Sequence, residues 1–233
     1  MGVLVTRGPR PLSVAGPDLD GLGPLVREED LLGPVDVVAR ELLGCWVVTD
    51  RPAGRVVLRL TEVEAYSGDG MDPAAHSHRG PTPRAAIMFG PPGRLYVYFS
   101  YGVHWCANVV VGPDGRGQAV LLRAGEVVVG EELARSRRPA ARTARDLARG
   151  PARLTQALAI GPDDLDVDLL SPASPVRLHT GATPATISAG PRVGISQATD
   201  LPWRFWETDA PSVSVFRAGG KPRRARAGQD GVL

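Results

Sequence analysis

The sequence predicts an α+β fold, a single domain in which helices pack around an antiparallel β-sheet. Residues 55–60 and 95–100 alternate apolar and polar side chains with the period of two that is typical of half-buried strands. Residues 37–43 instead place apolar side chains at helical spacing. The chain has 233 residues, 43% of them hydrophobic and 22% charged, and this length and composition indicate one soluble globular domain.

The two ends of the chain differ from the part between them. Residues 1–24 are rich in Gly and Pro and predict a flexible leader, residues 25–217 form the expected main domain, and residues 218–233 predict a basic flexible tail. No stretch resembles a signal peptide or approaches the roughly 18 apolar residues of a membrane span. We therefore expect a cytoplasmic monomer without membrane contact, in which Cys45 and Cys106 are reduced and buried.

The first helix and the first strand are expected before residue 50. Pro34 and Asp36 suit a helix start, and Gly44 would end the helix. A strand over residues 45–48 should follow directly.

The strand that begins at residue 55 carries the first candidate functional residues. Its apolar face would be formed by Val56, Leu58 and Leu60. If the strand continues unbroken, Glu62, Glu64 and Tyr66 lie on that same face. Carboxylates on a dry face are costly unless they are paired or used in function, so both glutamates are site candidates.

A long connection and a tyrosine-rich strand follow. Residues 68–92 are rich in Gly and Pro, and a connection of this length inside a compact domain is usually functional or disordered. Its polar candidates are His76, His78, Arg79 and Arg84. In the next strand, alternation places Tyr96 and Tyr98 on one face, about 7 Å apart.

The later elements are less sharply marked. Residues 119–124 predict a short apolar strand that contains Arg123, and the region around residues 130–160 has a helical pattern. Residues 161–190 suggest turns and short strands. Late strands of the same domain are expected over residues 192–197, 204–206 and 212–216.

Basic residues gather in two places. The whole chain has 27 basic and 25 acidic residues, and this balance alone says little. Residues 133–153, however, hold seven arginines against one acid, and residues 217–226 hold five basic residues and no acid. Such clusters suit a polyanion, because each neutralised phosphate releases counterions. The alternatives are a solvated helix face and a disordered tail.

Five motifs occur in an order that resembles the alkyladenine (3-methyladenine) DNA glycosylase family. They are TEVEAY, AAHS, LYVYFSYG with Asn108 downstream, LLRA and GPARLTQALAI, and the resemblance extends from about Leu31 to Phe216. It implies a curved antiparallel sheet with surrounding helices and a protruding β-hairpin, similar to the C-terminal domain of formyltransferases. The hairpin would point toward the minor groove of DNA.

The resemblance implies a DNA repair enzyme that acts on double-stranded DNA containing damaged purines. It would flip an alkylated or deaminated purine out of the duplex and hydrolyse its N-glycosidic bond, leaving an abasic site, because that bond is not accessible inside the stack. Tyr101 would intercalate into the gap. The flipped base would lie between Tyr66 and Tyr98, with His76 on the remaining side. Asn108 would crowd the exocyclic amino group of guanine.

The same resemblance assigns the chemistry. Glu64 is the expected general base, which deprotonates a water that attacks C1′, and Arg123 would hold that carboxylate and the water. Glu62 stays open between support of the site and a structural ion pair. Contacts with the DNA backbone are expected from Tyr96, Arg79 and Arg84. No cofactor or metal is expected, since the mechanism needs none and His78 and His104 lack metal-ligand spacing.

The hairpin loop after residue 100 allows a geometric prediction. If Tyr101 and Gly102 alone formed the loop, Tyr98 and Asn108 would point to opposite faces, because a one-residue slip inverts the side. Both can line one pocket only if the loop has an odd length. The simplest such loop runs from Tyr101 to Val103, with a positive φ at or beside Gly102.

Other interpretations stay open. Glu62 and Glu64 could form the pair of an inverting sugar glycosidase, since they lie about 7 Å apart on one strand face. A damaged-DNA-binding module without catalysis would use the arginines and Tyr101 but would not need Glu64. A formyltransferase-like domain does not need the carboxylate and tyrosine site. A covalent amine route that cuts the strand needs a lysine or a free N-terminus near the sugar. The only lysine is Lys221, in the tail, so this route is not expected.

Overall fold

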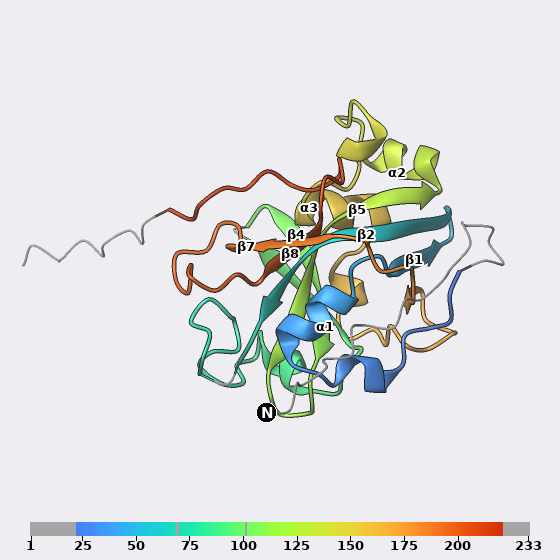
Figure 1. Cartoon of the computed structure of the whole chain (residues 1–233). Coiled ribbons are helices and arrows are strands. Elements are labelled where there is room, and N and C mark those ends of the chain that lie inside the picture. Colours follow the sequence, from blue (N-terminus) through green and yellow to red (C-terminus); the bar gives the residue numbers. More distant parts are fainter. Residues whose placement is uncertain (1–21, 69, 101, 221–233) are drawn as a thin grey trace, which may run out of the picture.

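The computed structural model describes residues 22–68, 70–100 and 102–220, and it shows one curled antiparallel sheet with helices packed on it (Figure 1). The strands are β1 (Trp46–Arg51), β2 (Gly54–Tyr66), β3 (Leu95–Ser100), β4 (His104–Val111), β5 (Gln118–Val129), β6 (Val176–His179), β7 (Ile187–Gly190) and β8 (Arg204–Glu207). The α-helices are α1 (Val35–Glu41), α2 (Glu131–Arg137) and α3 (Pro151–Leu158), and 3₁₀ segments span Glu28–Leu31, Ala86–Phe89, Ala144–Asp146 and Pro162–Asp164. The predicted α+β class and the curved antiparallel sheet are confirmed.

Strand β2 is the centre of the sheet. The strand order is β3-β4-β5-β2-β1-β6, and β8 pairs with β2 and β7. The first half of β2 pairs with β1, and residues 62–64 of the same strand pair with β8. β1 and β8 therefore occupy the same edge of β2 one after the other, and the neighbouring strand changes at the middle of β2.

Two β-bulges lie at that point. Thr61 is an extra residue of β2 in the register with β5, and Arg123 is an extra residue of β5. A bulge of one residue changes which side chains face the core. The core face of β2 therefore passes from Leu60 to Val63.

The expectation that Glu62, Glu64 and Tyr66 share the apolar face of the strand is wrong. The bulge turns them to the opposite face, while Val63 and Ala65 join the core. The alternation pattern assumed an unbroken strand and could not reveal the extra residue. Both carboxylates are nevertheless fully buried, because β8 and the segments beside it cover them.

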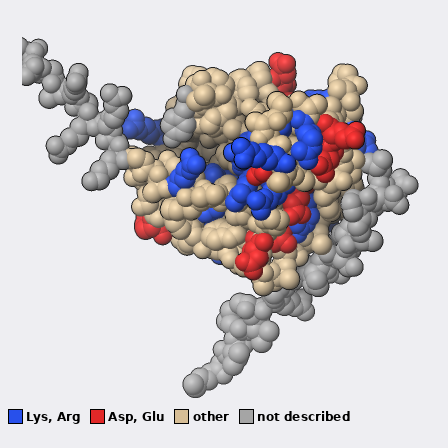
Figure 2. Space-filling model, turned by 90° about the horizontal axis from the view of Figure 1, so that it is seen from above, with Lys and Arg blue, Asp and Glu red and all other residues tan. Residues whose placement is uncertain are grey.

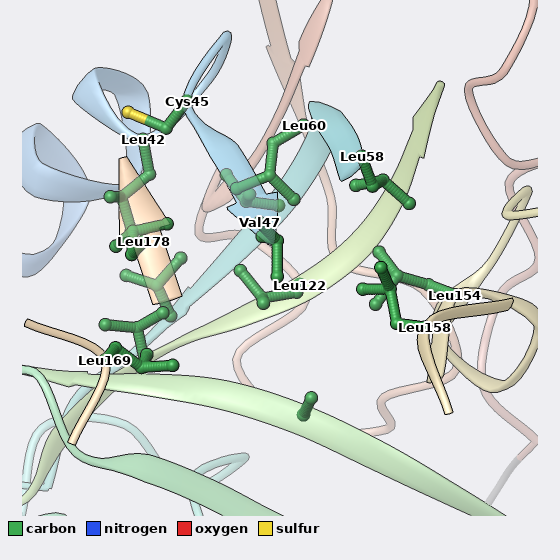
Figure 3. Close-up of a cluster of buried hydrophobic side chains, with 14 of the residues drawn as sticks. Leu42, Cys45, Val47, Leu58, Leu60, Leu122, Leu154, Leu158, Leu169 and Leu178 are labelled. Carbon is green, nitrogen blue, oxygen red and sulfur yellow. The ribbon is translucent and has the colours of Figure 1, made fainter. Parts of the chain in front are cut away.

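The main hydrophobic core lies on the other face of the sheet, beneath α1 and α3. Figure 3 shows Leu58, Leu60 and Leu122 of the sheet in one cluster with Leu154 and Leu158 of α3. The apolar residues of α3 recur at spacings of three and four, which directs them all toward the sheet. Fully burying a leucine side chain contributes about 1.5–3 kcal/mol, so this cluster is a main source of stability.

The helix expected around residues 130–160 forms only at the two ends of that range. Residues 138–150 are irregular apart from one 3₁₀ turn. Arg138 precedes Pro139 and has φ −127°, in agreement with the bias of pre-proline residues away from the α conformation. Pro151 occupies the first turn of α3, where its missing N–H is not needed.

Two of the expected late strands do not form, whereas residues 204–206 lie in β8 as predicted. Residues 192–197 and 212–216 are irregular. Within them, the backbone N–H of Val193 donates to Glu64 and that of Ser214 donates to Glu62. These backbone groups therefore satisfy buried carboxylates instead of joining a neighbouring strand.

The predicted leader and tail lie mostly outside the described residues, which begin at Leu22 and end at Gly220. Cys45 and Cys106 are buried free thiols, as expected. In the part of the chain that the structure describes, no helix is long and apolar enough to cross a membrane.

The hairpin between β3 and β4 has the predicted odd-length loop. Ser100 pairs with His104, so three residues separate the strands, and Gly102 within the loop has φ +67°. Tyr98 and Asn108 consequently line the same cavity. The prediction from alternation is confirmed.

Gly125 of β5 pairs with Leu60 of β2 and leaves no room for a side chain. A Cβ at this position would lie 2.3 Å from Leu58 Cδ2 and 2.4 Å from the carbonyl oxygen of Arg59. We expect Gly125→Ala to lower the free energy of unfolding by about 1–3 kcal/mol, measured by urea denaturation, because the site is overpacked. Gly161→Ala is the control, since a Cβ there meets nothing within 4 Å. Equal stability of the two variants would contradict this view of the packing.

Candidate active site

A row of side chains crosses the face of the sheet that is opposite the main core. Tyr96 pairs with Asn108, Asn108 with Leu121, and Leu121 with Glu64. Directly paired residues of antiparallel strands point to the same face. The register therefore brings four strands to one surface, and residues that are far apart in the sequence become neighbours there.

A cavity of about 670 Å³ opens on this face. Its walls come from β2 to β5, from the connection before β3, and from residues 193–195. Predicted site residues in its lining are Tyr66, His76, Tyr98, Asn108 and Arg123, together with two of the residues expected at the DNA backbone, Tyr96 and Arg84. The volume falls within the roughly 300–1,000 Å³ of small-molecule sites, so it can hold a single nucleobase with its sugar but not a stacked duplex.

The aromatic wall of the cavity is built around Tyr98. The His76 ring meets it edge-on with centroids 4.6 Å apart, and the Tyr96 ring lies 5.5 Å away at a tilt of 30°. Burial raises the pKa of Tyr98, so this phenol stays protonated. Desolvation and the charge of Arg84 lower the pKa of His76 to about 4, although the ring is exposed to the cavity, and the imidazole is neutral at neutral pH.

Glu64 lies behind the cavity wall and has no exposed surface. Its Oε2 accepts hydrogen bonds from the Tyr66 hydroxyl at 2.9 Å and from Arg123 Nη1 at 3.2 Å. Its Oε1 accepts one from the backbone N–H of Val193 at 2.6 Å. All three donor residues line the cavity, so the carboxylate is held immediately beneath its surface.

Glu62 is the more fully bonded of the two carboxylates. Its Oε1 accepts hydrogen bonds from Arg123 Nε at 2.8 Å, from Arg204 Nε at 2.7 Å and from the Ser214 hydroxyl at 2.8 Å, and its Oε2 accepts one from the Ser214 N–H at 2.6 Å. Burial alone would raise the pKa of Glu62, but the two arginines and the Ser214 N–H outweigh it, so the pKa is lowered. An inverting glycosidase pair needs a water between its carboxylates. Here the guanidinium of Arg123 occupies the space between Glu62 and Glu64, so no water fits there and the interpretation as a sugar glycosidase is excluded.

An arginine supports Tyr66 from behind. The guanidinium carbon of Arg192 lies 4.5 Å from the centroid of the Tyr66 ring. Arg192 forms a bidentate pair with Asp72 at 2.6 and 2.8 Å, and both side chains are fully buried. The same guanidinium donates to the carbonyl oxygen of Ala65. This contact set fixes the Tyr66 ring and ties the connection that carries His76 to the end of β2.

The residues expected at the DNA backbone have different surroundings. Tyr96 is only 2% exposed and its hydroxyl lies 3.1 Å from His76 Nδ1, so it belongs to the inner cavity wall and cannot reach a phosphate. Arg79 and Arg84 are exposed. Arg84 lies 5.1 Å over the Tyr98 ring, at the cavity rim. Tyr101, the expected intercalating residue, lies outside the described residues.

The arginine-rich segment of residues 133–153 is not a single helix face. Four of its arginines bond to neighbouring groups of the fold: Arg135, Arg137, Arg138 and Arg149. Arg142, Arg145 and Arg153 are exposed. Figure 2 shows basic side chains gathered on the face seen from above, with acidic ones among them. Pro151 lines the cavity, so one end of this segment reaches the site.

Several residues of the site are not among the predicted site residues. The sequence predicts no site role for Arg192, Val193, Arg204 and Ser214, although all four lie in the expected late strands. One signal was available: two carboxylates on a buried strand require cationic partners. Arg192 and Arg204 stand in two of the expected late strands, and pairing them with the acids would have been a reasonable prediction.

Comparison with known proteins agrees with this geometry. Residues 29–211 match the family described as methylpurine-DNA glycosylase. The chain belongs to this family. A relative from Nocardia farcinica is 52% identical over 200 residues, which cover 83% of this chain and 92% of the relative. One from Streptomyces avermitilis is 48% identical over 217 residues, covering 91% and 99%. A third, from Mycobacterium tuberculosis, is 51% identical over 199 residues, covering 83% and 95%.

All three relatives bear the name "Putative 3-methyladenine DNA glycosylase". The family resemblance inferred from the five motifs is confirmed. The residues that match the methylpurine-DNA glycosylase family include all residues that line the cavity and both buried carboxylates.

The pair of Asp72 and Arg192 should be needed for stability. Asp72→Asn leaves the Arg192 charge buried without its partner, and we expect it to lower the free energy of unfolding by about 3–5 kcal/mol in urea denaturation. Asp50→Asn is the matched control. Its carboxylate is 36% exposed and pairs with Arg55 and Arg177, so its loss should cost about 0–1 kcal/mol. Similar losses in both variants would show that burial does not set the strength of these pairs.

Proposed function

We propose that this protein removes damaged purines from double-stranded DNA by hydrolysing their N-glycosidic bond, and that Glu64 is the general base. The observation that carries the proposal is a buried carboxylate held by Arg123, Tyr66 and Val193 directly beneath an aromatic cavity of nucleobase size. Membership of the methylpurine-DNA glycosylase family supports the reaction class.

The substrate base enters the cavity after it has flipped out of the duplex. Tyr66 and Tyr98 stack on its faces, and His76 closes the remaining side. Stacking on aromatic side chains contributes about 1–3 kcal/mol per base, which offsets much of the few kcal/mol of unpairing. The cavity geometry supports this arrangement, since all three rings line it and Arg192 fixes the Tyr66 ring from behind.

His76 assists the departure of neutral lesions such as hypoxanthine. When Tyr96 donates its O–H to Nδ1, the neutral imidazole carries its proton on Nε2 and can donate it to the flipped base. Alkylated purines that carry a positive charge are good leaving groups without this help, and electron-rich rings attract them.

Asn108 helps to discriminate against undamaged guanine. Its amide nitrogen donates to the carbonyl oxygen of Tyr96 at 3.0 Å, so the side chain is fixed in the cavity wall. A fixed amide at this place crowds the exocyclic amino group of guanine and disfavours the undamaged base.

Glu64 accepts the proton of the attacking water. A carboxylate offers about four lone-pair sites, and three are engaged here, so one remains for a water at C1′. The negative charge beside the sugar also stabilises the positive charge that develops on it in the transition state. Arg123 fixes the carboxylate and contributes a donor that orients the water.

DNA approaches over the mouth of the cavity. The hairpin loop between β3 and β4 enters the minor groove, and Tyr101 fills the gap that the flipped base leaves. Arg79, Arg84 and the exposed arginines of residues 133–153 bind phosphates on this side. The protein works at DNA in the cytoplasm, and with the nucleoid in a bacterial cell.

Glu64→Gln should abolish base release while retaining binding. With enzyme in excess over a duplex that contains one hypoxanthine or ethenoadenine, we expect the release rate to fall by at least about 100-fold, since a general base contributes 10²–10⁴-fold. The dissociation constant for the same duplex should change little. If wild type and variant both bind tightly and neither releases the base, the protein is a damage sensor and the proposal fails.

Base release should leave the DNA strand intact. An amine that attacked C1′ would form a covalent intermediate and cut the strand, but the only lysine is Lys221, near the end of the chain. We expect borohydride to trap no protein–DNA adduct during turnover, and the abasic product to break no faster than in buffer. A trapped adduct would point to an amine nucleophile.

A further inference from the structure

We propose that Glu62 is a positioning residue, which orients Arg123 so that its guanidinium meets Glu64, and that Ser214 completes this support. The inference rests on the proposed function, because it concerns how the catalytic carboxylate is held. It extends that function to residues that do not reach the cavity. Neither Glu62 nor Ser214 lines the cavity, so each acts through Arg123 and not on the substrate.

The guanidinium of Arg123 is held at three of its nitrogens. Nε donates to Glu62 at 2.8 Å, Nη2 donates to the Ser214 hydroxyl at 3.3 Å, and Nη1 donates to Glu64 at 3.2 Å. The guanidinium is planar, so two fixed nitrogens determine the direction of the third. Glu62 and Ser214 supply the two contacts that point Nη1 at Glu64.

Glu62 itself has no freedom to move. It is fully buried, and each of its oxygens is occupied: Oε1 by Arg123, Arg204 and the Ser214 hydroxyl, and Oε2 by the Ser214 N–H at 2.6 Å. Arg204 also donates to the Ser214 carbonyl oxygen at 2.8 Å. A carboxylate bound on both oxygens is a rigid support, which a mobile surface ion pair is not.

The bulge explains why Arg123 needs this support. Arg123 is the extra residue of β5, so it lacks a direct cross-strand partner in the ladder. Its side chain is nevertheless buried, at 6% exposure. With the local ladder disrupted, polar contacts at the end of the side chain decide its orientation.

The chain beyond β8 is thereby part of the site. Besides the bonds of Ser214, the Ser212 hydroxyl lies 2.8 Å from that of Thr61, the bulged residue of β2, and Arg149 donates to the Val213 carbonyl oxygen. Residues 212–214 thus join both bulged strands and the arginine-rich segment.

The test compares Glu62→Gln with a matched control. The amide of the variant has the size of the carboxylate. Its NH₂ group must face either the arginines or the Ser214 N–H, so at one of these contacts two donors face each other and the hydrogen bond is lost. We expect release of hypoxanthine by excess enzyme to slow by about ten- to hundredfold, the effect of a misplacement near 1 Å. Affinity for a duplex with an abasic-site analogue should stay within about twofold. Glu207→Gln on β8, which removes the negative charge that pairs with Arg59 at 2.7 Å, should change neither.

A double variant tests whether Glu62 acts through Arg123. In the Arg123→Met background, adding Glu62→Gln should slow release little further, because the orientation it sets is already lost. If the two effects multiply, or if Glu62→Gln releases the base as fast as wild type, the assignment is overturned. A wild-type protein that releases no base overturns the proposed function instead.

Ser214→Ala provides a milder variant in case Glu62→Gln does not fold. It keeps the N–H bond to Glu62 and removes only the hydroxyl shared with Arg123. We expect release to slow by about three- to tenfold, in line with the loss of one buried hydrogen bond, with unchanged duplex affinity. An unchanged release rate in this variant would contradict the role of Ser214.

Discussion

The buried cluster of Glu62, Glu64, Arg123 and Arg204 is the constraint on which the rest of the structure depends. Two carboxylates without exposed surface would be costly if unpaired, and two arginines match them in charge and in hydrogen bonds. The four residues come from β2, β5 and β8, so these strands must meet at one place. The two bulges and the exchange of β1 for β8 along β2 occur there.

The two faces of the sheet differ in role. One face carries the leucine-rich core under α1 and α3, and the other carries the cavity. Which face a side chain takes depends on the alternation along each strand. The extra residue at Thr61 inverts this alternation in β2, and the three-residue loop keeps Tyr98 and Asn108 on one face across the hairpin. A core residue and a site residue can therefore be adjacent in sequence, as Val63 and Glu64 are.

Much of this arrangement could be predicted from the sequence, and the exceptions share a physical cause. Alternation and motif order predicted the sheet, the loop parity and several residues of the cavity. They failed at Thr61 because a bulge leaves no periodic signal. They also failed for residues 192–197 and 212–216, whose apolar alternation resembles that of strands. There, long-range bonds to Glu64 and Glu62 take up backbone groups, and local sequence contains no information about partners more than a hundred residues away.

Charge matching beneath the cavity also bears on catalysis. The formal charges of the cluster cancel, and Arg192 with Asp72 forms a second neutral pair beside it. The field that these buried groups create at the cavity therefore comes from their orientation and not from a net charge, while Arg84 adds a positive charge at the rim. Oriented groups that need no rearrangement during the reaction are the most effective at stabilising developing charge. Under the proposed mechanism, rigid support of Arg123 serves the chemistry as well as the fold, because a freely rotating guanidinium would supply the same charge without its direction.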